Sequence, residues 1–448
     1  MSPDVVVVGA GSAGVAAAVS AAEEGARTVL VEASGSVGGT LAWQWLEHSA
    51  GFHDVRGGQV TGGFGQRLVD RLVSAGASPG HVRDDVGYTA TRTPVDHASL
   101  AMIESILLDE AGVSVWLQSA PCGLRRDHAG ITELEVQTPQ GLRILPAAVV
   151  VDTTGDAAVA ALAGAPMQPD TAETQPASLS FKVGGIDVPA LLAYLRAHPE
   201  EVRPGSVLAD DTAEHVNVWG LGGLLAEGRA RGLLSLHRSE LHVAAWPRRH
   251  EAVFNVTRTP TGTGDAWLGN AHARLARQVL EVVEWLRAMV PGFAQCFLTA
   301  VADRVGIRES RRVLGAYTMT GADVHGGAAF PDAIGRGAFP VDVHSATSPG
   351  LSHTDAVGTG YAIPLRALQV PVVPNLLVAG RCVSCSHEAN GSLRITATCF
   401  VTGEAAGVSA AVASATGTPP SQVEVRQVQA RLRERAAVLD DSQVTPTA

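Results

Sequence analysis

The chain opens with an apolar run that stops at a group of small residues. Residues 5–8 are four consecutive valines, and Gly9, Gly11 and Gly14 follow directly. A second apolar run covers residues 28–31. A short continuous apolar run bounded by glycine is typical of a strand buried on both faces, and the small apolar residues between the runs favour a helix. The pattern therefore predicts a strand, a glycine turn, a helix and a second strand.

Further along the chain, apolar spacing predicts additional helices and strands. Helices are expected over residues 60–75, 98–111, 187–197, 264–289, 392–413 and 423–439, and strands over residues 113–118, 131–137, 142–144, 147–152, 178–183, 252–256 and 372–378. Strand–helix alternation is lost in the middle of the chain and returns later. We therefore predict an α/β fold in four parts: a discontinuous Rossmann-like domain (1–166 and 370–416), an inserted α+β substrate domain (167–369) and a C-terminal helix and tail (417–448) with disordered final residues.

The first glycine turn has the spacing that a dinucleotide requires. Gly9 permits the tight turn, Gly11 lets the backbone approach a pyrophosphate, and Gly14 lets the helix pack on the strand. Glu32, at the tip of the second strand, is placed to accept ribose hydroxyls. An ordinary glycine-rich turn is the alternative. The predicted contacts in this segment are Gly9, Gly11, Ser12, Ala13, Gly14, Glu32 and Ala33.

Two later segments specify the dinucleotide further. Gly38-Gly39-Thr40 resembles the flavoprotein form of this motif, in which the loop passes beside the FAD pyrophosphate; a surface turn is the alternative. The strand ending before Thr154-Gly155-Asp156 brings backbone to the carboxyl edge of the sheet, where a simple strand–helix turn is the alternative. The strand insert before it resembles that of flavoproteins, which would put the backbone around Cys122 beside the adenine.

Composition limits the classes of partner and location. The 448 residues carry a formal net charge of −11 and lack a basic cluster with interleaved aromatic residues, so we expect no nucleic-acid partner. Residues 5–22 are apolar but lack a basic leading segment, so we expect neither a signal peptide nor a membrane span. Five cysteines in a chain of this length do not indicate a disulfide framework. We therefore expect a cytoplasmic protein.

Several segments together resemble the FAD-dependent oxidoreductases of the "FAD oxidored" type, which are related to the fumarate-reductase and glucose-inhibited-division flavoproteins. The matching segments are Gly9–Gly14 with Glu32, Gly38-Gly39-Thr40, and residues 151–166, 254–258, 305–312, 339–344, 361–364 and 375–406. The resemblance implies a Rossmann-like FAD-binding domain of the glutathione-reductase kind with an inserted substrate domain. FAD is the cofactor that it implies, whereas it leaves the substrate open.

The resemblance also assigns flavin contacts in the last third of the chain. It implies that Gly380 and Arg381 lie at the ribityl and pyrophosphate groups. It places Ser392, Leu393 and Arg394 at the pyrimidine edge of the flavin, at the start of the C-terminal helix, where helix N–H groups stabilise the charge of a reduced flavin. Arg381 is a departure, because many flavoproteins have an aspartate there. This weakens the analogy to the disulfide reductases.

Three residues are candidates for catalysis. His387, next to Glu388, could act as a general base, and a structural loop histidine is the alternative. His344 and Asp342 are two apart on an extended segment and point to the same side, so the carboxylate could orient the histidine and raise its basicity. Arg308 could clamp a substrate carboxylate, or could belong to a salt-bridge network with neighbouring charges. Asn255 and Arg258 are weaker candidates of the same kind.

The residues leave three functions open. The first is hydride transfer between a small organic substrate and flavin N5, in either direction. The second is an NAD(P)H-dependent monooxygenase or a disulfide reductase that uses Cys382 and Cys385, although the sequence lacks a second complete glycine fingerprint. The third is a non-redox protein with structural FAD. We expect no metal site, since no second C-x-x-C or suitably spaced histidine pair accompanies the two cysteines. The electron acceptor, the oligomeric state and the attachment of FAD stay open.

Overall fold

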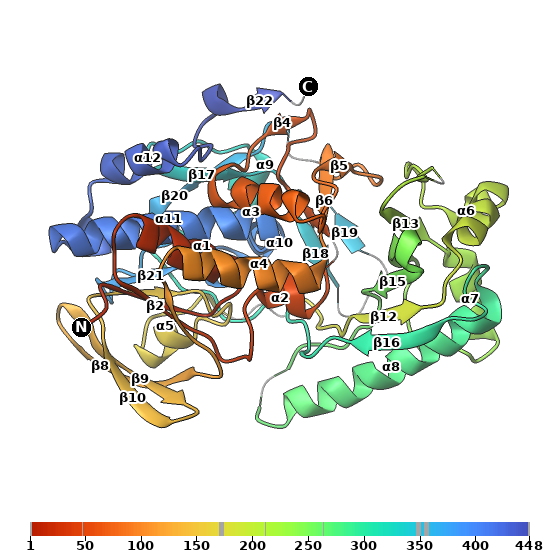
Figure 1. Ribbon diagram of the computed structural model, residues 1–448, viewed down its shortest axis with the longest axis horizontal. Helices are drawn as coiled ribbons and strands as arrows, with labels where there is room; N and C mark the ends of the chain where they lie inside the picture. The colour runs from red at the N-terminus through yellow and green to blue at the C-terminus, as the bar shows by residue number, and fades with distance from the viewer. Residues whose placement is uncertain are drawn as a thin grey trace.

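A five-stranded parallel sheet forms the centre of the computed structural model, which describes residues 2–46, 48–169, 174–210, 212–262, 264–345, 351–353 and 358–446. Its strands, in the order β21-β11-β1-β2-β7, are Leu376–Val378, Val149–Asp152, Val5–Val8, Thr28–Val31 and Ser114–Trp116. All four pairings are parallel. The predicted α/β class is therefore confirmed, and β21 joins the sheet from the far end of the chain (Figure 1).

Different elements pack against the two faces of this sheet, and the valine side chains of β1 point alternately to one face and the other. Val5 and Val7 belong to a core cluster with the helices of one face, whereas Val6 and Val8 belong to a second cluster on the other face. The first face carries α1 (Ser12–Glu23), α2 (Gly39–Trp43), α3 (Gly63–Ser74), α4 (His97–Glu110) and α11 (Thr396–Thr416). The second carries α5 (Ala158–Leu162) and the antiparallel strands β8 (Ala120–Asp127), β9 (Gly130–Thr138) and β10 (Gly141–Pro146).

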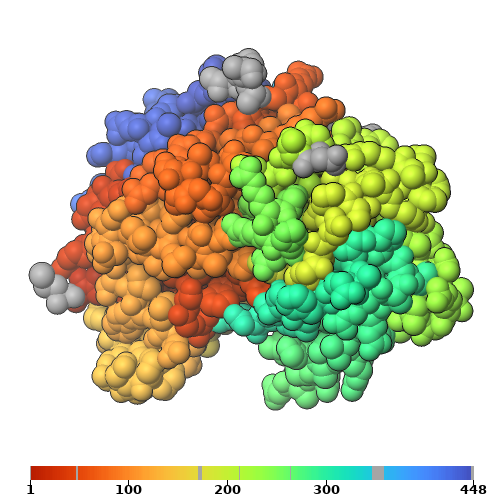
Figure 2. Space-filling model, turned by 45° about the vertical axis from the view of Figure 1, so that its right-hand side comes forward, coloured from red at the N-terminus to blue at the C-terminus, as the bar shows by residue number. Residues whose placement is uncertain are grey.

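The middle of the chain builds a separate antiparallel sheet with its own core. Its order is β13-β14-β15-β12-β16, and the strands are Val216–Gly220, Leu241–Trp246, Glu251–Phe254, Phe181–Gly184 and Phe297–Val301. The helices α6 (Val188–Ala197), α7 (Gly222–Ala230) and α8 (Trp267–Met289) accompany it. Figure 2 shows this green and teal part as a lobe beside the orange surface of the N-terminal part.

Four smaller sheets and three short helices complete the described structure. One is a three-stranded sheet of β3 (His48–Ala50), β6 (Thr91–Pro94) and β5 (Val82–Arg83). The others are two-stranded: β17 (Ala333–Gly337) with β20 (Tyr361–Pro364), β18 (Asp342–His344) with β19 (Leu351–His353), and β4 (Gly58–Gln59) with β22 (Thr445–Pro446). The remaining helices are α9 (Gly321–His325), α10 (His387–Leu393) and α12 (Val425–Glu434). The prediction of a disordered tail is wrong as far as Pro446, because β22 pairs with β4; residues 447 and 448 lie outside the described residues.

Two other predictions are corrected. The helix expected over 392–413 is instead α10 followed by α11, with a 90° bend at Arg394 and Ile395. The segment has no proline at the bend, so the sequence pattern does not mark it. Strand β8 was not predicted, because its side chains lack the alternation of a half-buried strand. Asp96 caps the start of α4, accepting a 2.8 Å bond from the Ser99 N–H.

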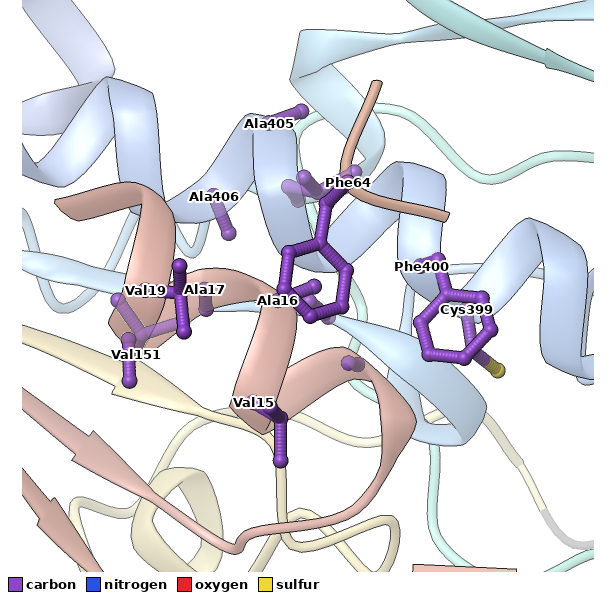
Figure 3. Packing of buried hydrophobic residues seen from close by; sticks show 14 of the residues in the cluster. Val15, Ala16, Ala17, Val19, Phe64, Val151, Cys399, Phe400, Ala405 and Ala406 are labelled. Atoms are coloured by element: carbon purple, nitrogen blue, oxygen red, sulfur yellow. The ribbon is translucent and has the colours of Figure 1, made fainter. Parts of the chain in front are cut away.

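The helices α1 and α11 approach each other at backbone distance. A Cβ on Gly403 would stand 2.2 Å from the carbonyl oxygen of Ala13, and one on Gly407 would stand 2.1 Å from that of Ala17. Figure 3 shows the small side chains of α1 and α11 facing each other near Phe64 and Phe400. Both glycines have helical backbone angles that any residue can adopt, so it is the close approach of the two helices that requires glycine at these positions.

Among the described residues, no single helix is long and apolar enough to cross a membrane. The bent pair of α10 and α11 passes this test by length and composition, but nearly all of α11 is buried in the core.

The close approach of α1 and α11 predicts that a Gly→Ala substitution has opposite effects on the free energy of unfolding at two helical glycines. Gly407→Ala places a methyl group against the α1 backbone and should lower the free energy of unfolding by about 1–3 kcal/mol. Gly269→Ala, on the exposed side of α8 with open space around it, should raise that free energy by up to about 1 kcal/mol. Urea unfolding of both variants checks this; equal effects would contradict the packing.

Candidate functional site

Each glycine of the first turn is required for a different steric reason. Gly9 has φ +100°, a conformation that side chains rarely adopt. A Cβ on Gly14 would stand 1.7 Å from the carbonyl oxygen of Gly9, so α1 can only start this close to β1 with glycine there. A Cβ on Gly11 would instead point into open space, with only the Gly39 Cα within 4 Å. The glycine turn therefore leaves room for a ligand at the start of α1, where free N–H groups favour a phosphate.

Glu32 is fixed beside this space. One carboxylate oxygen accepts a 2.7 Å bond from the Ala10 N–H, and the other accepts bonds from the N–H and hydroxyl of Ser34 at 2.7 and 2.6 Å. Ala33 stands between these two anchored residues. The acidic tip is therefore held against the glycine turn, and its remaining lone pairs suit a ribose hydroxyl.

The Gly38-Gly39-Thr40 segment contacts the glycine turn directly. The Gly38 N–H donates a 2.8 Å bond to the Ala10 carbonyl, and α2 begins at Gly39. The buried Glu104 carboxyl lies beside Gly38, without a hydrogen-bond partner among the described residues. Burial raises the pKa of Glu104 to about 8, so this acid is mainly uncharged at neutral pH. An uncharged neighbour is compatible with a phosphate in this loop, and the segment fits the expected cofactor.

A polar network connects the predicted contacts at Asp156 and Arg381. The Asp156 carboxylate accepts a 2.8 Å bond from the Arg381 guanidinium and a 2.6 Å bond from the Ser310 hydroxyl. Burial acts to raise the pKa of Asp156, but these two partners outweigh it and lower the pKa. Gly155, between Thr154 and Asp156, has φ +76°. The position of Arg381 is therefore fixed by an acid on the neighbouring strand–helix turn.

The residues expected at the flavin pyrimidine edge lie at the end of α10 and at the bend after it, and not at the start of the long helix α11 as predicted. Ser392 and Leu393 close α10, and the Ser392 hydroxyl is turned into the core, where it donates to the Phe339 carbonyl and bonds to the Tyr361 hydroxyl. Arg394 lies at the bend before α11. The expectation that these residues begin the long helix is therefore wrong, since that helix starts at Thr396. The N–H groups available at its first turn are those of residues 396–398.

The structure pairs His387 with an acid that is distant in sequence. Its Nδ1 lies 2.8 Å from both carboxylate oxygens of Glu309, which is buried and also pairs with Arg312. Burial acts to raise the pKa of Glu309, but His387 and Arg312 lower it, so this acid is charged. Glu388, which is next to His387 in sequence, pairs instead with His325. Glu309 therefore orients the imidazole and leaves its Nε2 for another partner.

His344 lies beside Asp342 as the extended pattern predicts. Its Nε2 is 3.1 Å from an Asp342 carboxylate oxygen. The expected rise in basicity is absent, however. Burial, assisted by the charges of Arg308 and Arg394, outweighs Asp342 and lowers the pKa of His344 to about 3. His344 is therefore neutral at physiological pH and a weak base.

Arg308 is held by neutral acceptors and not by the acids beside it in sequence. It donates to the Pro176 carbonyl at 2.8 Å, to the Ser178 hydroxyl at 3.0 Å and to the Asn255 side chain at 3.3 Å. Burial, followed by the charges of neighbouring arginines, lowers the pKa of Arg308 to about 9. The salt-bridge network expected around Arg308 forms without it, because Glu309 pairs with Arg312.

Gln175 joins two of the three candidate residues, His387 and His344, and was missed by the sequence analysis. Its N–H donates to Glu309 at 3.1 Å, and its side-chain oxygen accepts bonds from the His344 N–H at 3.2 Å and from Arg394 at 3.3 Å. Arg394 also donates to Asp342 at 3.1 Å. One network thus connects His387, through Glu309 and Gln175, to the Arg394–Asp342–His344 group. A lone glutamine outside a motif gives no sequence signal for this role.

The C-x-x-C cysteines lie in the interior. Cys382 and Cys385 are free and fully buried, as is Cys296, whereas Cys122 is exposed on β8. Burial raises the pKa of Cys385 to about 12. A buried thiol of high pKa is a poor nucleophile, so this arrangement favours structural thiols.

Comparison with known proteins identifies the family of this chain. A family model described as "FAD dependent oxidoreductase" matches residues 4–432. None of the curated proteins matches the sequence. The solved structures to which this chain is similar include a geranylgeranyl bacteriochlorophyll reductase-like protein from Thermoplasma acidophilum, with 13% sequence identity and a TM-score of 0.49; the match covers 98% of this chain and 84% of that one. They also include p-nitrophenol 4-monooxygenase from Pseudomonas putida (11% identity, TM-score 0.47, 96% and 84%).

The open space at Gly11 predicts a variant that folds without its cofactor. Gly11→Val should leave the secondary structure intact, because a Cβ there meets no protein atom closer than 3.8 Å, but should abolish FAD binding by filling the pyrophosphate space. Circular dichroism and the flavin content after reconstitution measure the two effects separately. A folded Gly11→Val protein with one equivalent of FAD would contradict the assignment.

Burial of the thiols predicts their reactivity. In the native protein a thiol reagent should modify Cys122 rapidly and the other four cysteines only after unfolding. Cys385→Ser should keep turnover within about tenfold of the wild type, equivalent to about 1.4 kcal/mol of barrier. Rapid native labelling of Cys382 or Cys385, together with a larger loss of turnover, would restore the dithiol hypothesis.

Proposed function

The chain belongs to the family of FAD-dependent oxidoreductases, and from this premise we propose that it moves a hydride between a small organic substrate and flavin N5. When bound, the flavin supplies the redox chemistry, and the protein supplies binding, orientation and charge. The observation that carries the proposal is the single network joining His387, Glu309 and Gln175 to Arg394, at the bend before α11.

Within this network, His387 is suited to hold or move a proton. Glu309 accepts from Nδ1, which fixes the ring and leaves Nε2 to take a proton from a substrate O–H or N–H. Hydride loss from a C–H bond requires such a proton acceptor whenever the product is a carbonyl or imine. Of the two candidate histidines, His387 has a buried orienting carboxylate, whereas burial lowers the pKa of His344 to about 3 and makes it a weak base.

Arg308 and His344 are suited to bind and orient the substrate. Arg308 carries positive charge in a position fixed by three acceptors, and His344 is a neutral hydrogen-bonding group. Both lie within the electrostatic reach of Arg394, which the family resemblance places at the flavin. A substrate bound here would lie beside the cofactor with its reacting group toward His387.

The test of the reaction type is anaerobic. A panel of hydroxy acids, amino acids and amines is mixed with the oxidised holoenzyme, and the flavin's visible absorption is followed. The proposal expects bleaching by at least one organic substrate in the absence of NAD(P)H. Bleaching by NADPH alone would favour a monooxygenase or reductase, and no bleaching by any donor would favour structural FAD.

The roles of the two histidines predict a difference in rate. With the substrate that reduces the wild-type flavin, His387→Ala should retain FAD and slow flavin reduction by about 10²–10⁴-fold. His325→Ala is the matched control, because that histidine pairs with exposed Glu388 outside the network and should leave the rate unchanged. Stopped-flow measurements that show wild-type reduction in His387→Ala would remove His387 as the base.

A further inference from the structure

The inserted sheet has one apolar face and one face that carries polar side chains. Every second side chain along its inner strands belongs to the apolar core shared with α6, α7 and α8, for example Val183, Val216, Val218, Leu241, Val243 and Phe254. Because side chains alternate along a strand, the residues between them point to the opposite face. We call this opposite face the polar face, after its residues Ser180, Asn217, Trp219, His242 and Asn255.

The strand register aligns the polar face in a row that leads to the candidate site. Trp219 on β13 is directly opposite His242 on β14. Continuing the pairings of β14 and β12 with β15 by one residue places His242 and Ser180 on either side of Asn255. The Asn255 side-chain oxygen accepts a 3.3 Å bond from Arg308. The row therefore runs from the edge strand β13 to one of the three candidate residues.

The cofactor-binding part covers the polar face. Arg92 Nη1 lies 2.8 Å from Nδ1 of His215, which immediately precedes β13. Arg203 donates a 2.5 Å bond to the Tyr88 hydroxyl, and its guanidinium lies 5.2 Å from the Tyr88 ring centre and 5.4 Å from that of Trp219. Figure 1 shows β6 and β18 on the side of β13 and β15 opposite to α6 and α7. The polar face thus lies at the junction of the two parts.

Three uncharged groups of the polar face are buried without a hydrogen-bond partner in the described part of the chain. They are the Trp219 indole Nε1, the Asn217 amide Nδ2 and the Ser180 hydroxyl. The exposed fraction is 1% for Ser180 and 2% for Asn217. His242 fixes two of the three, because its ring stacks on Trp219 at 4.5 Å and its Nε2 bonds to the Asn217 side-chain oxygen. Since buried polar groups are normally hydrogen-bonded, these three groups indicate a bound molecule with oxygen atoms.

We propose that the polar face binds the hydroxyl groups of a polyhydroxylated substrate. A hydroxyl group suits all three unpartnered groups, because its oxygen accepts from the Trp219 and Asn217 N–H groups and its proton can be donated to Ser180. Trp219 and Asn255 are two strands apart, roughly 10 Å, which an extended chain of about six carbon atoms with terminal oxygens spans. This inference rests on the proposed function and adds the substrate class, since a CH–OH group at the Asn255 end would lie beside Arg308.

The proposal is tested by binding to the FAD holoenzyme, with no turnover required. Sorbitol, 1,6-hexanediol and 1-hexanol share one carbon chain and carry progressively fewer hydroxyl groups. Each is titrated into the oxidised holoenzyme, and calorimetry and the flavin's visible spectrum report binding. We expect saturable binding of sorbitol that perturbs the flavin spectrum, weaker binding of the diol and the weakest binding of hexanol. Equal or reversed affinities would overturn the proposal, as would no saturable binding of sorbitol.

Two variants each remove a single unpartnered group. Trp219→Phe keeps an aromatic ring without the N–H, and Ser180→Ala removes the hydroxyl. Each should weaken sorbitol binding about three- to tenfold, as expected for losing one neutral hydrogen bond, and should leave the melting temperature of the ligand-free holoenzyme unchanged. Trp285→Phe is the matched control, because that indole N–H donates to the Leu224 carbonyl at 3.2 Å on the apolar side of the sheet.

The control should lower the melting temperature and leave the sorbitol affinity unchanged. Flavin content verifies that each variant carries FAD. Wild-type sorbitol affinity in both the Trp219→Phe and the Ser180→Ala holoenzymes would overturn the assignment of the polar face.

The two proposals fail in distinguishable ways. If an organic substrate bleaches the flavin and sorbitol does not bind, hydride transfer stands and the assignment of the polar face is wrong. If sorbitol binds with the expected dependence on Trp219 and Ser180 but only NADPH bleaches the flavin, the polar face stands and the proposed reaction is wrong.

Discussion

The contact between α1 and α11 is the constraint on which the site depends. Gly403 and Gly407 allow the backbones of these helices to touch at Ala13 and Ala17, and no larger residue fits there without displacement. The start of α1 faces the nucleotide turn, and the start of α11 follows the bend at Arg394. Because the two helices are locked at this distance, the phosphate-binding turn and the predicted flavin edge have one fixed separation. Gly380 lies at the same contact: its N–H donates to the Thr402 hydroxyl, and a Cβ on it would stand 3.0 Å from the Ala13 Cβ.

The chemistry of the site comes from joining this rigid cofactor half to the inserted sheet. Pro176, Ser178 and Asn255, which hold Arg308, belong to segments flanking β12 and β15, whereas His387 and Arg394 belong to α10 and the bend. Gln175 spans the two parts. Burial then affects the groups differently: Glu309 stays charged beside Arg312, His344 stays neutral, and Arg308 retains its charge.

The cofactor-binding part could be predicted from the sequence because the residues that indicate it are close together along the chain. Four valines, three glycines and an acidic tip lie within the first 32 residues, and each acts on its near neighbours. The substrate half was less accessible. His387 and its carboxylate partner are 78 residues apart, and Gln175 acts through contacts with residues 134, 169 and 219 positions away. The bend between α10 and α11 was missed because no proline marks the end of the first helix. Neighbourhood in the sequence was also misleading. Glu388 is next to His387 in the sequence, but its carboxylate pairs with His325, and His387 pairs with Glu309.

A structure of the FAD holoenzyme tests the central claim most directly. The account predicts that the isoalloxazine ring lies against the bend at Arg394 and the first turn of α11. It further predicts that the face with N5 opens toward His387 and Arg308, with space between them for a small molecule. If the ring instead lies with N5 away from the Gln175 network, separated from it by protein, the assignment of these residues to the reaction would be contradicted.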